Sequence, residues 1–181
     1  MTSTLERWNS LPRGDAEAEI IACCGSQRWA SELAARRPFA NFAQLCDTAD
    51  EIWWALDRAD WLVAFAAHPK IGEHAAIGPE TARRWSAQEQ AAADADADAD
   101  SAIDDAESSL AKRLATTNRA YQLRFGFIFI VDASGKSRAE ILAILKQRIQ
   151  NNPRTELREA AEQQRRIARR RLEKLFAAGG A

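Results

Sequence analysis

The stretch NFAQLCDTADEIWWAL, residues 41–56, indicates the fold class of this 181-residue chain. Its apolar residues recur at intervals of three to four and fall on one face of a helix: Phe42, Leu45, Ala49, Ile52, Trp53 and Leu56. Ala-, Leu- and Arg-rich windows elsewhere in the chain have similar spacing, and there are only 8 glycines and 5 prolines. We therefore expect an all-α fold, a single-domain multi-helix bundle over residues 1–181.

Further helices are expected on both sides of this stretch. Two of them cover residues 16–24 and 27–37. Another begins after Asp60 as its N-cap, and the others begin near Ser86, Ser109, Ser137 and Pro153. The helix from Asp60 must weaken at His68, because Pro69 disfavours a helical conformation in the residue before it. Residues 69–85 are expected to form a loop.

Two segments depart from the helical pattern. The run FGFIFIV, residues 125–131, is rich in aromatic and β-branched residues, which favours a short extended, buried segment near 127–131. The alanine–aspartate tract at 91–105 is of low complexity, and half of its residues have almost no side chain to pack. We expect it to be a solvated, variable helix or loop without a function of its own.

Composition excludes several classes of function. The 25 Lys and Arg residues balance 26 Asp and Glu residues, so the net charge of −1 argues against bulk attraction to nucleic acid or to an anionic membrane. No run of 18 apolar residues exists to span a bilayer, and the first residues do not resemble a signal peptide. Cys23, Cys24 and Cys46 form no C-x-x-C pair, and we expect them to be buried thiols in a cytoplasmic protein.

The histidines are two, and both lie in the segment HPKIGEH, residues 68–74. His68, Glu73 and His74 suggest a metal site of a hydrolase, but the spacing between the histidines fits neither a helical i, i+4 pair nor a finger. His68 is also a candidate for proton transfer, because its unperturbed pKa of about 6.5 lies near neutrality. A structural role at a helix end is the third reading.

The segment Ser86-Ala87-Gln88-Glu89 has the S-x-x-E form of a capping box that opens a helix. A box of this kind needs no ligand. A helix N-terminus also offers free N–H groups to an anion, and Gln90 adds an amide that can both donate and accept. The structural and ligand-binding readings are compatible if the box borders a pocket.

The arginine-rich segment 165–171 raises nucleic-acid or acidic-protein binding as an alternative function. Glutamates are interleaved in the same helix: Glu156, Glu159, Glu162 and Glu173. That mixture favours a solvated or partner-facing helix face. We therefore expect no nucleic-acid partner.

Taken in order, the motifs resemble those of one family. They are His68-Pro69-x-Ile71-Gly72, Trp85-Ser86-x-x-Glu89-Gln90, Asn118-x-x-Tyr121-x-x-Arg124-Phe125-Gly126, the run to Val131, Ser137-x-x-Glu140-Ile141-Leu142 and Arg148-x-x-Asn151. Each motif is weak by itself, but the ordered set over residues 5–176 resembles the 2-oxo-4-hydroxy-4-carboxy-5-ureidoimidazoline (OHCU) decarboxylases of urate degradation.

The resemblance implies an all-helical lyase, usually a homodimer, that converts OHCU to (S)-allantoin and carbon dioxide without cofactor or metal. It also implies roles for individual residues. The catalytic ones would be His68 and Glu89, and the substrate-binding ones Pro69, Ser86, Gln90, Phe129, Ile130 and Val131. An extended segment at 129–131 would present backbone N–H and C=O groups to the amides of the substrate.

Overall fold

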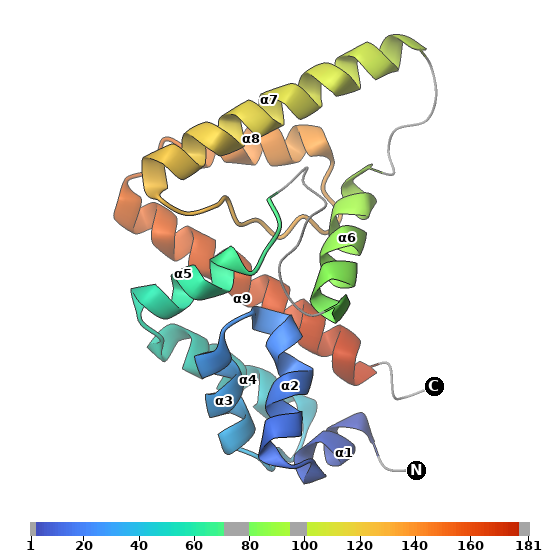
Figure 1. Ribbon diagram of the computed structural model, residues 1–181, viewed down its shortest axis with the longest axis vertical. Helices are drawn as coiled ribbons and strands as arrows, with labels where there is room; N and C mark the ends of the chain where they lie inside the picture. Colours follow the sequence, from blue (N-terminus) through green and yellow to red (C-terminus); the bar gives the residue numbers. More distant parts are fainter. Residues whose placement is uncertain (1–2, 71–79, 95–100, 178–181) are drawn as a thin grey trace. The chain divides into compact units, whose positions relative to one another are not determined.

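The computed structural model describes residues 3–70, 80–94 and 101–177, with side chains for all of these except 89–94, 101–108 and 177 (Figure 1). All regular elements in these ranges are helices, which confirms the all-α fold. They are α1 Thr4–Ser10, α2 Arg13–Cys24, α3 Gln27–Ala35, α4 Phe42–Ala55, α5 Arg58–Ala66, α6 Glu80–Asp94, α7 Ser101–Phe125, α8 Arg138–Arg148 and α9 Pro153–Ala177. None of these helices is both long enough and apolar enough to cross a membrane.

The chain divides into two compact units. The first contains residues Met1–Ala64 and Gln164–Ala181, and the second contains Phe65–Gln163. Two helices, α5 and α9, contribute residues to both units.

The first unit begins with short helices whose ends match their sequence. Ser26 and Asn41 cap α3 and α4, since their side chains accept hydrogen bonds from the N–H groups of Trp29 and Gln44 at 3.2 and 2.9 Å. Gly25 ends α2 in the left-handed region with φ of 78°, where a side chain would be strained. Helix α3 packs against both α2 and α4 (Figure 1).

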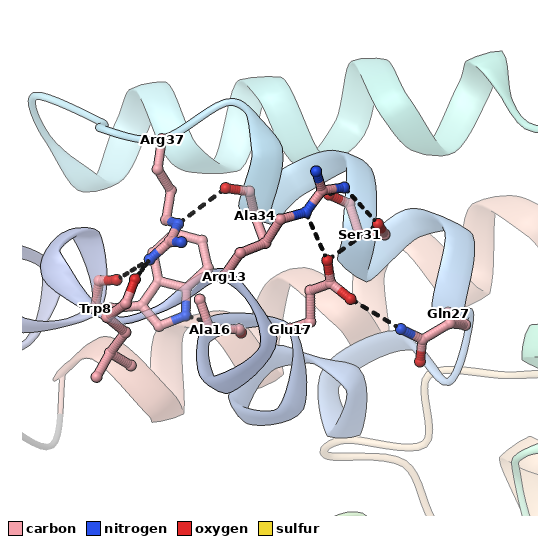
Figure 2. Close-up of polar contacts among 9 residues, drawn as sticks. Trp8, Arg13, Ala16, Glu17, Gln27, Ser31, Ala34 and Arg37 are labelled. Carbon is pink, nitrogen blue, oxygen red and sulfur yellow. Dashed lines mark hydrogen bonds and ion pairs between the residues drawn. The ribbon is translucent and has the colours of Figure 1, made fainter.

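Tryptophans dominate the interior of this unit. Trp8, Trp29 and Trp53 are at most 2% exposed, and the indole N–H groups of Trp8 and Trp29 donate to backbone carbonyls of Ala16 and Ala49. The three cysteines are buried free thiols, as expected. Figure 2 shows polar contacts of this unit, in which Arg13 and Gln27 donate hydrogen bonds to the carboxylate of Glu17.

The second unit contains α7 and α8, which pack against each other, and the non-helical connection between them (Figure 1). Ser137 and Glu140 form the capping box expected at the start of α8. The connection contains Phe127, Phe129, Ile130 and Val131, each at most 7% exposed. The short buried segment expected near 127–131 is therefore confirmed, although it pairs with no strand in the described residues.

Several expected helix starts are wrong. Helix α5 begins at Arg58, before Asp60, because the Asp57 carboxylate accepts the N–H of Asp60 at 3.0 Å and takes the capping position. Helix α6 begins at Glu80, so residues 80–85 are not loop, and Ser86 lies inside a helix rather than at its N-cap. Helix α7 begins at Ser101 rather than near Ser109, because acidic residues near its first turn, Asp104 and Asp105, suit the positive end of the helix dipole. Within the tract 91–105, residues 91–94 and 101–105 are helical, and 95–100 lie outside the described residues.

Candidate active site

His68 and Pro69 follow the C-terminus of α5, and both are half-buried. The backbone N–H of His68 donates to the carbonyl of Phe65 at 3.1 Å, which closes the chain into a turn after the helix. The Phe65 ring contacts the Phe127 ring with 5.5 Å between centroids. This contact joins the helix end that carries His68 to the start of the 127–131 segment.

Ser86, Glu89 and Gln90 all lie in α6. Ser86 is only 5% exposed. Their i, i+3, i+4 spacing places the three positions on one side of the helix, a feature of the sequence that does not depend on the incorrect capping interpretation. His68, α6 and the 129–131 segment all belong to the second unit.

The backbone of the 129–132 segment is hydrogen-bonded at two alternate residues, Ile130 and Asp132. The carbonyl of Ile130 accepts from Arg148 Nη1 at 2.7 Å, the N–H of Asp132 donates to Gln163 Oε1 at 2.9 Å, and the carbonyl of Asp132 accepts from Lys136 Nζ at 2.9 Å. In an extended chain, alternate residues direct their N–H and C=O groups to the same side.

An extended segment directs the backbone groups of Phe129 and Val131 to the opposite edge. Within the described part of the chain, their backbone N–H and C=O groups have no hydrogen-bond partner, although the residues are 4% and 7% exposed. Buried backbone groups without partners are costly unless water or a ligand binds them. This edge is therefore suited to bind a molecule that carries paired amide donors and acceptors.

A buried polar cluster lies behind the segment. One carboxylate oxygen of Glu156 accepts hydrogen bonds from the Tyr121 hydroxyl and from Arg148 Nε and Nη2, the latter two at 2.9 and 2.6 Å. The other oxygen accepts from Asn151 Nδ2 at 2.8 Å. Burial, reinforced by the Glu156 carboxylate, raises the pKa of Tyr121 well above its usual value, so its hydroxyl remains a donor.

The role of Arg148 in this cluster was missed from the sequence, although a signal for it exists. Ile141, Leu145 and Arg148 follow i, i+4, i+7 spacing, so the arginine occupies a position on the apolar face of α8. An arginine at such a position needs a buried partner, which is Glu156, 0% exposed.

The arginine-rich segment is partly internal. Asp50 pairs with Arg165 and Arg169 at 2.5 and 3.3 Å, and Arg171 is 3% exposed and donates to the carbonyl of Ala22. The expectation of a solvated face is therefore wrong for Arg171, because α9 turns that position into the interior of the first unit. These three contacts weaken the nucleic-acid alternative, because they occupy arginines that it requires.

The Asp50 ion pairs also border a small cavity of about 10 Å³ in the first unit. It is lined by Trp29, Cys46, Ala49, Asp50, Trp53, Arg165, Ala168, Arg169 and Leu172. A cavity of this size has room for roughly one water molecule. It is too small for an organic substrate.

Glu73 and His74, which the alternative metal interpretation requires, lie outside the described residues. Among residues 3–70, 80–94 and 101–177, no group of three His, Cys, Asp or Glu side chains could hold a metal ion.

Comparisons with known proteins agree on one family. The sequence profile of OHCU decarboxylase matches residues 9–173. The chain is 39% identical over 163 residues to an Arabidopsis thaliana protein named uric acid degradation bifunctional protein TTL, covering 88% of this chain and 47% of that protein. It is 27% identical to the 2-oxo-4-hydroxy-4-carboxy-5-ureidoimidazoline decarboxylase of Haloferax volcanii, covering 82% of this chain and 81% of that one.

Solved structures give the same result. A crystal structure of OHCU decarboxylase in the presence of (S)-allantoin is 36% identical, with a TM-score of 0.71, covering 88% of this chain and 97% of that one. An (S)-allantoin synthase structure is 20% identical with a TM-score of 0.65, covers 95% of this chain and 54% of that one, and shares the fold. The chain spans about half the length of the Arabidopsis relative, 47%. The match over residues 9–173 shows that the chain belongs to the OHCU decarboxylase family.

Proposed function

We propose that this chain catalyses the decarboxylation of OHCU to (S)-allantoin and carbon dioxide, a step of urate degradation. The family match over residues 9–173 supports the reaction. The observation in the structure that carries the proposal is the backbone of Phe129 and Val131, whose N–H and C=O groups have no hydrogen-bond partner among the residues that the structure describes. The ureido and imidazolone groups of OHCU carry the amide donors and acceptors that such an edge binds.

The proposed reaction needs no electron sink beyond the substrate. When the C4 carboxylate leaves as carbon dioxide, its bonding electron pair forms a C4–C5 double bond, and the electrons of the ring C=N move to nitrogen, which takes up a proton. A proton is then added at C5, and the C4 hydroxyl loses its proton to become a carbonyl. Protonation from one face of C5 sets the S configuration. This chemistry supports catalysis without cofactor or metal.

We assign the reacting side chains to two elements of the second unit. His68, after α5, orients the carboxylate and hydroxyl of the substrate, and Glu89, in α6, forms a hydrogen bond with the hydroxyl. Pro69, Ser86 and Gln90 contribute to substrate binding beside the 129–131 segment. Exclusion of water from the site would weaken solvation of the carboxylate and favour its loss.

The test generates OHCU in situ from urate with urate oxidase and hydroxyisourate hydrolase, and follows allantoin by circular dichroism with and without a chelator. The protein should produce one enantiomer rapidly, and the chelator should not change the rate. Decay of OHCU no faster than in the absence of protein would refute the proposed function. A rate abolished by the chelator would refute the metal-free reaction.

Variants then test the two assigned residues. We expect His68→Ala and Glu89→Gln each to lower kcat/KM by at least about 100-fold, the lower end of a general acid–base contribution, without loss of helical content. The matched control is Glu19→Gln, which removes a glutamate that pairs with Arg7 on the surface of the first unit. It should keep wild-type kinetics. Unfolding of either site variant would instead support a structural role for that residue.

We also propose that the family domain comprises residues 1–181 as one domain, that it acts as a homodimer and that it works in the cytoplasm. Support for the dimer comes from the resemblance to the family. Sedimentation equilibrium of the purified protein should give twice the 20.1 kDa mass of one chain, and a monomer at micromolar concentration would refute the dimer.

A further inference from the structure

The contacts of Arg148 fix its guanidinium on three sides. Its Nε and Nη2 donate to Glu156 at 2.9 and 2.6 Å, and its remaining nitrogen, Nη1, donates to the carbonyl of Ile130 at 2.7 Å. The guanidinium carbon lies 4.7 Å from the centre of the Phe129 ring, within the range of a cation–π contact. Arg148 therefore contacts two of the three residues in the 129–131 segment.

The carboxylate that holds Arg148 is itself fully engaged. Glu156 is 0% exposed and also accepts hydrogen bonds from Tyr121 and Asn151. A buried ion pair adds little net stability compared with apolar residues of similar volume, because both charges lose their hydration. Apolar residues could not, however, donate the charge-assisted hydrogen bond that Arg148 Nη1 forms with the Ile130 carbonyl.

Fixing the Ile130 carbonyl also fixes the direction of its neighbours. Adjacent residues in an extended segment direct their backbone groups to opposite sides, so the bond on the Ile130 side turns the groups of Phe129 and Val131 toward the opposite edge. At Asp132, the N–H donates to Gln163 and the carbonyl accepts from Lys136, and these two bonds hold the far end of the segment on the same side as Ile130.

We infer that Arg148, held by Glu156, is a positioning residue that keeps the 129–131 backbone in the orientation that binds substrate amides. This inference rests on the proposed function. Arg148 acts through the backbone of Ile130 and needs no contact with the substrate. Because backbone binding groups contact the substrate in both the ground state and the transition state, loss of their orientation should raise KM more than it lowers kcat.

The test compares Arg148→Lys with the wild-type protein. Lysine keeps a positive charge for Glu156, but a single ammonium cannot reproduce the planar fork that reaches both Glu156 and Ile130. We expect KM for OHCU to rise about tenfold, the factor for loss of one charge-assisted hydrogen bond, with kcat changed by less than about twofold. Arg148→Met should raise KM further. If it does not fold, the lysine variant still decides.

Ile20→Val is the matched control, because it destabilises the core of the first unit, which lacks the segment. It should lower the melting temperature and leave KM unchanged. If Arg148 had a purely structural role, Arg148→Lys would also have a lower melting temperature and an unchanged KM. An unchanged KM in Arg148→Lys would therefore overturn the inference.

Hydrogen exchange provides a readout that does not depend on activity. Exchange of the backbone amides in a peptide covering residues 127–133 should rise about tenfold in Arg148→Lys and stay unchanged in Ile20→Val. An inactive wild-type protein would refute the proposed function, and with it the kinetic half of the inference. The exchange result would still decide whether Arg148 holds the segment, and equal exchange in the variant and wild type would overturn that half.

Discussion

Replacing Arg37 by methionine should lower the stability of the first unit by more than is usual for one half-buried side chain. Its guanidinium joins the C-terminal ends of two helices, α1 and α3 (Figure 2). Nη1 donates to the carbonyls of Trp8, Leu11 and Asn9 at 2.5, 3.0 and 3.4 Å, and Nε donates to the carbonyl of Ala34 at 2.9 Å. The guanidinium carbon also lies 5.1 Å from the Trp8 ring centre.

The magnitude follows from these contacts. A hydrogen bond to a charged group contributes about 1.5–3 kcal/mol when both partners are buried. Arg37 is half-buried, and water can replace part of what the exposed carbonyls lose. The positive charge near helix C-termini contributes a further 0.3–1 kcal/mol or so. We therefore expect Arg37→Met to lower the free energy of unfolding by about 2–4 kcal/mol, and Arg37→Lys to lower it by about half as much.

Urea unfolding followed by tryptophan fluorescence and far-UV circular dichroism measures this loss. The matched control is Arg13→Met, which removes an arginine of the same unit whose side chain is 61% exposed and pairs with Glu17 (Figure 2). Its loss should stay below about 1 kcal/mol, as for other exposed ion pairs. A loss below about 0.5 kcal/mol for Arg37→Met would refute the reasoning, because that is the usual range of surface substitutions.

Three further predictions concern the cysteines and helix capping. Burial raises the pKa of Cys24 to about 12 and that of Cys46 to about 11, so all three buried thiols should react slowly with a disulfide reagent until the protein unfolds. Because these folded-state pKa values lie above the unfolded value of 9.0, their contribution to stability is complete below about pH 9 and is lost as the pH rises toward 11. Urea midpoints measured between about pH 8 and about pH 10.5 should therefore fall, and a constant midpoint would contradict the burial of the thiols. Ser137→Ala should cost about 1 kcal/mol of unfolding free energy by removing one half of the α8 capping box, and no change in the urea midpoint would show that the box contributes nothing.

The sequence was most informative where periodicity and capping coincide. Helix α4 begins after Asn41, and α8 begins after Ser137, as their patterns predicted. Ser86 shows the limit of this reasoning, because S-x-x-E spacing also occurs between two residues inside a helix. The start of α6 at Glu80 could not be recognised from a motif that lies six residues later.

Some residues of the candidate site could be predicted from the sequence and others could not. The resemblance named His68, Glu89 and the 129–131 segment, and their roles stay predictions. The ion pair between Arg148 and Glu156 could not be predicted, because local sequence patterns do not show which residues from different helices contact each other in the interior. The sequence identifies Arg148 only as part of the motif Arg148-x-x-Asn151, and its partner lies in the next helix.

Helix α9 has a consequence for the order in which the chain can fold during synthesis. Its first turns bring Glu156 to Tyr121 and Arg148 in one unit, and its later turns bring Arg165 to Asp50 in the other. The ribosome synthesises α1 to α8 before α9. The hydrophobic core of each unit is therefore incomplete until this last helix emerges. Apolar surface on the nascent chain must therefore stay shielded from aggregation for most of translation, and this requirement comes from the placement of a single helix.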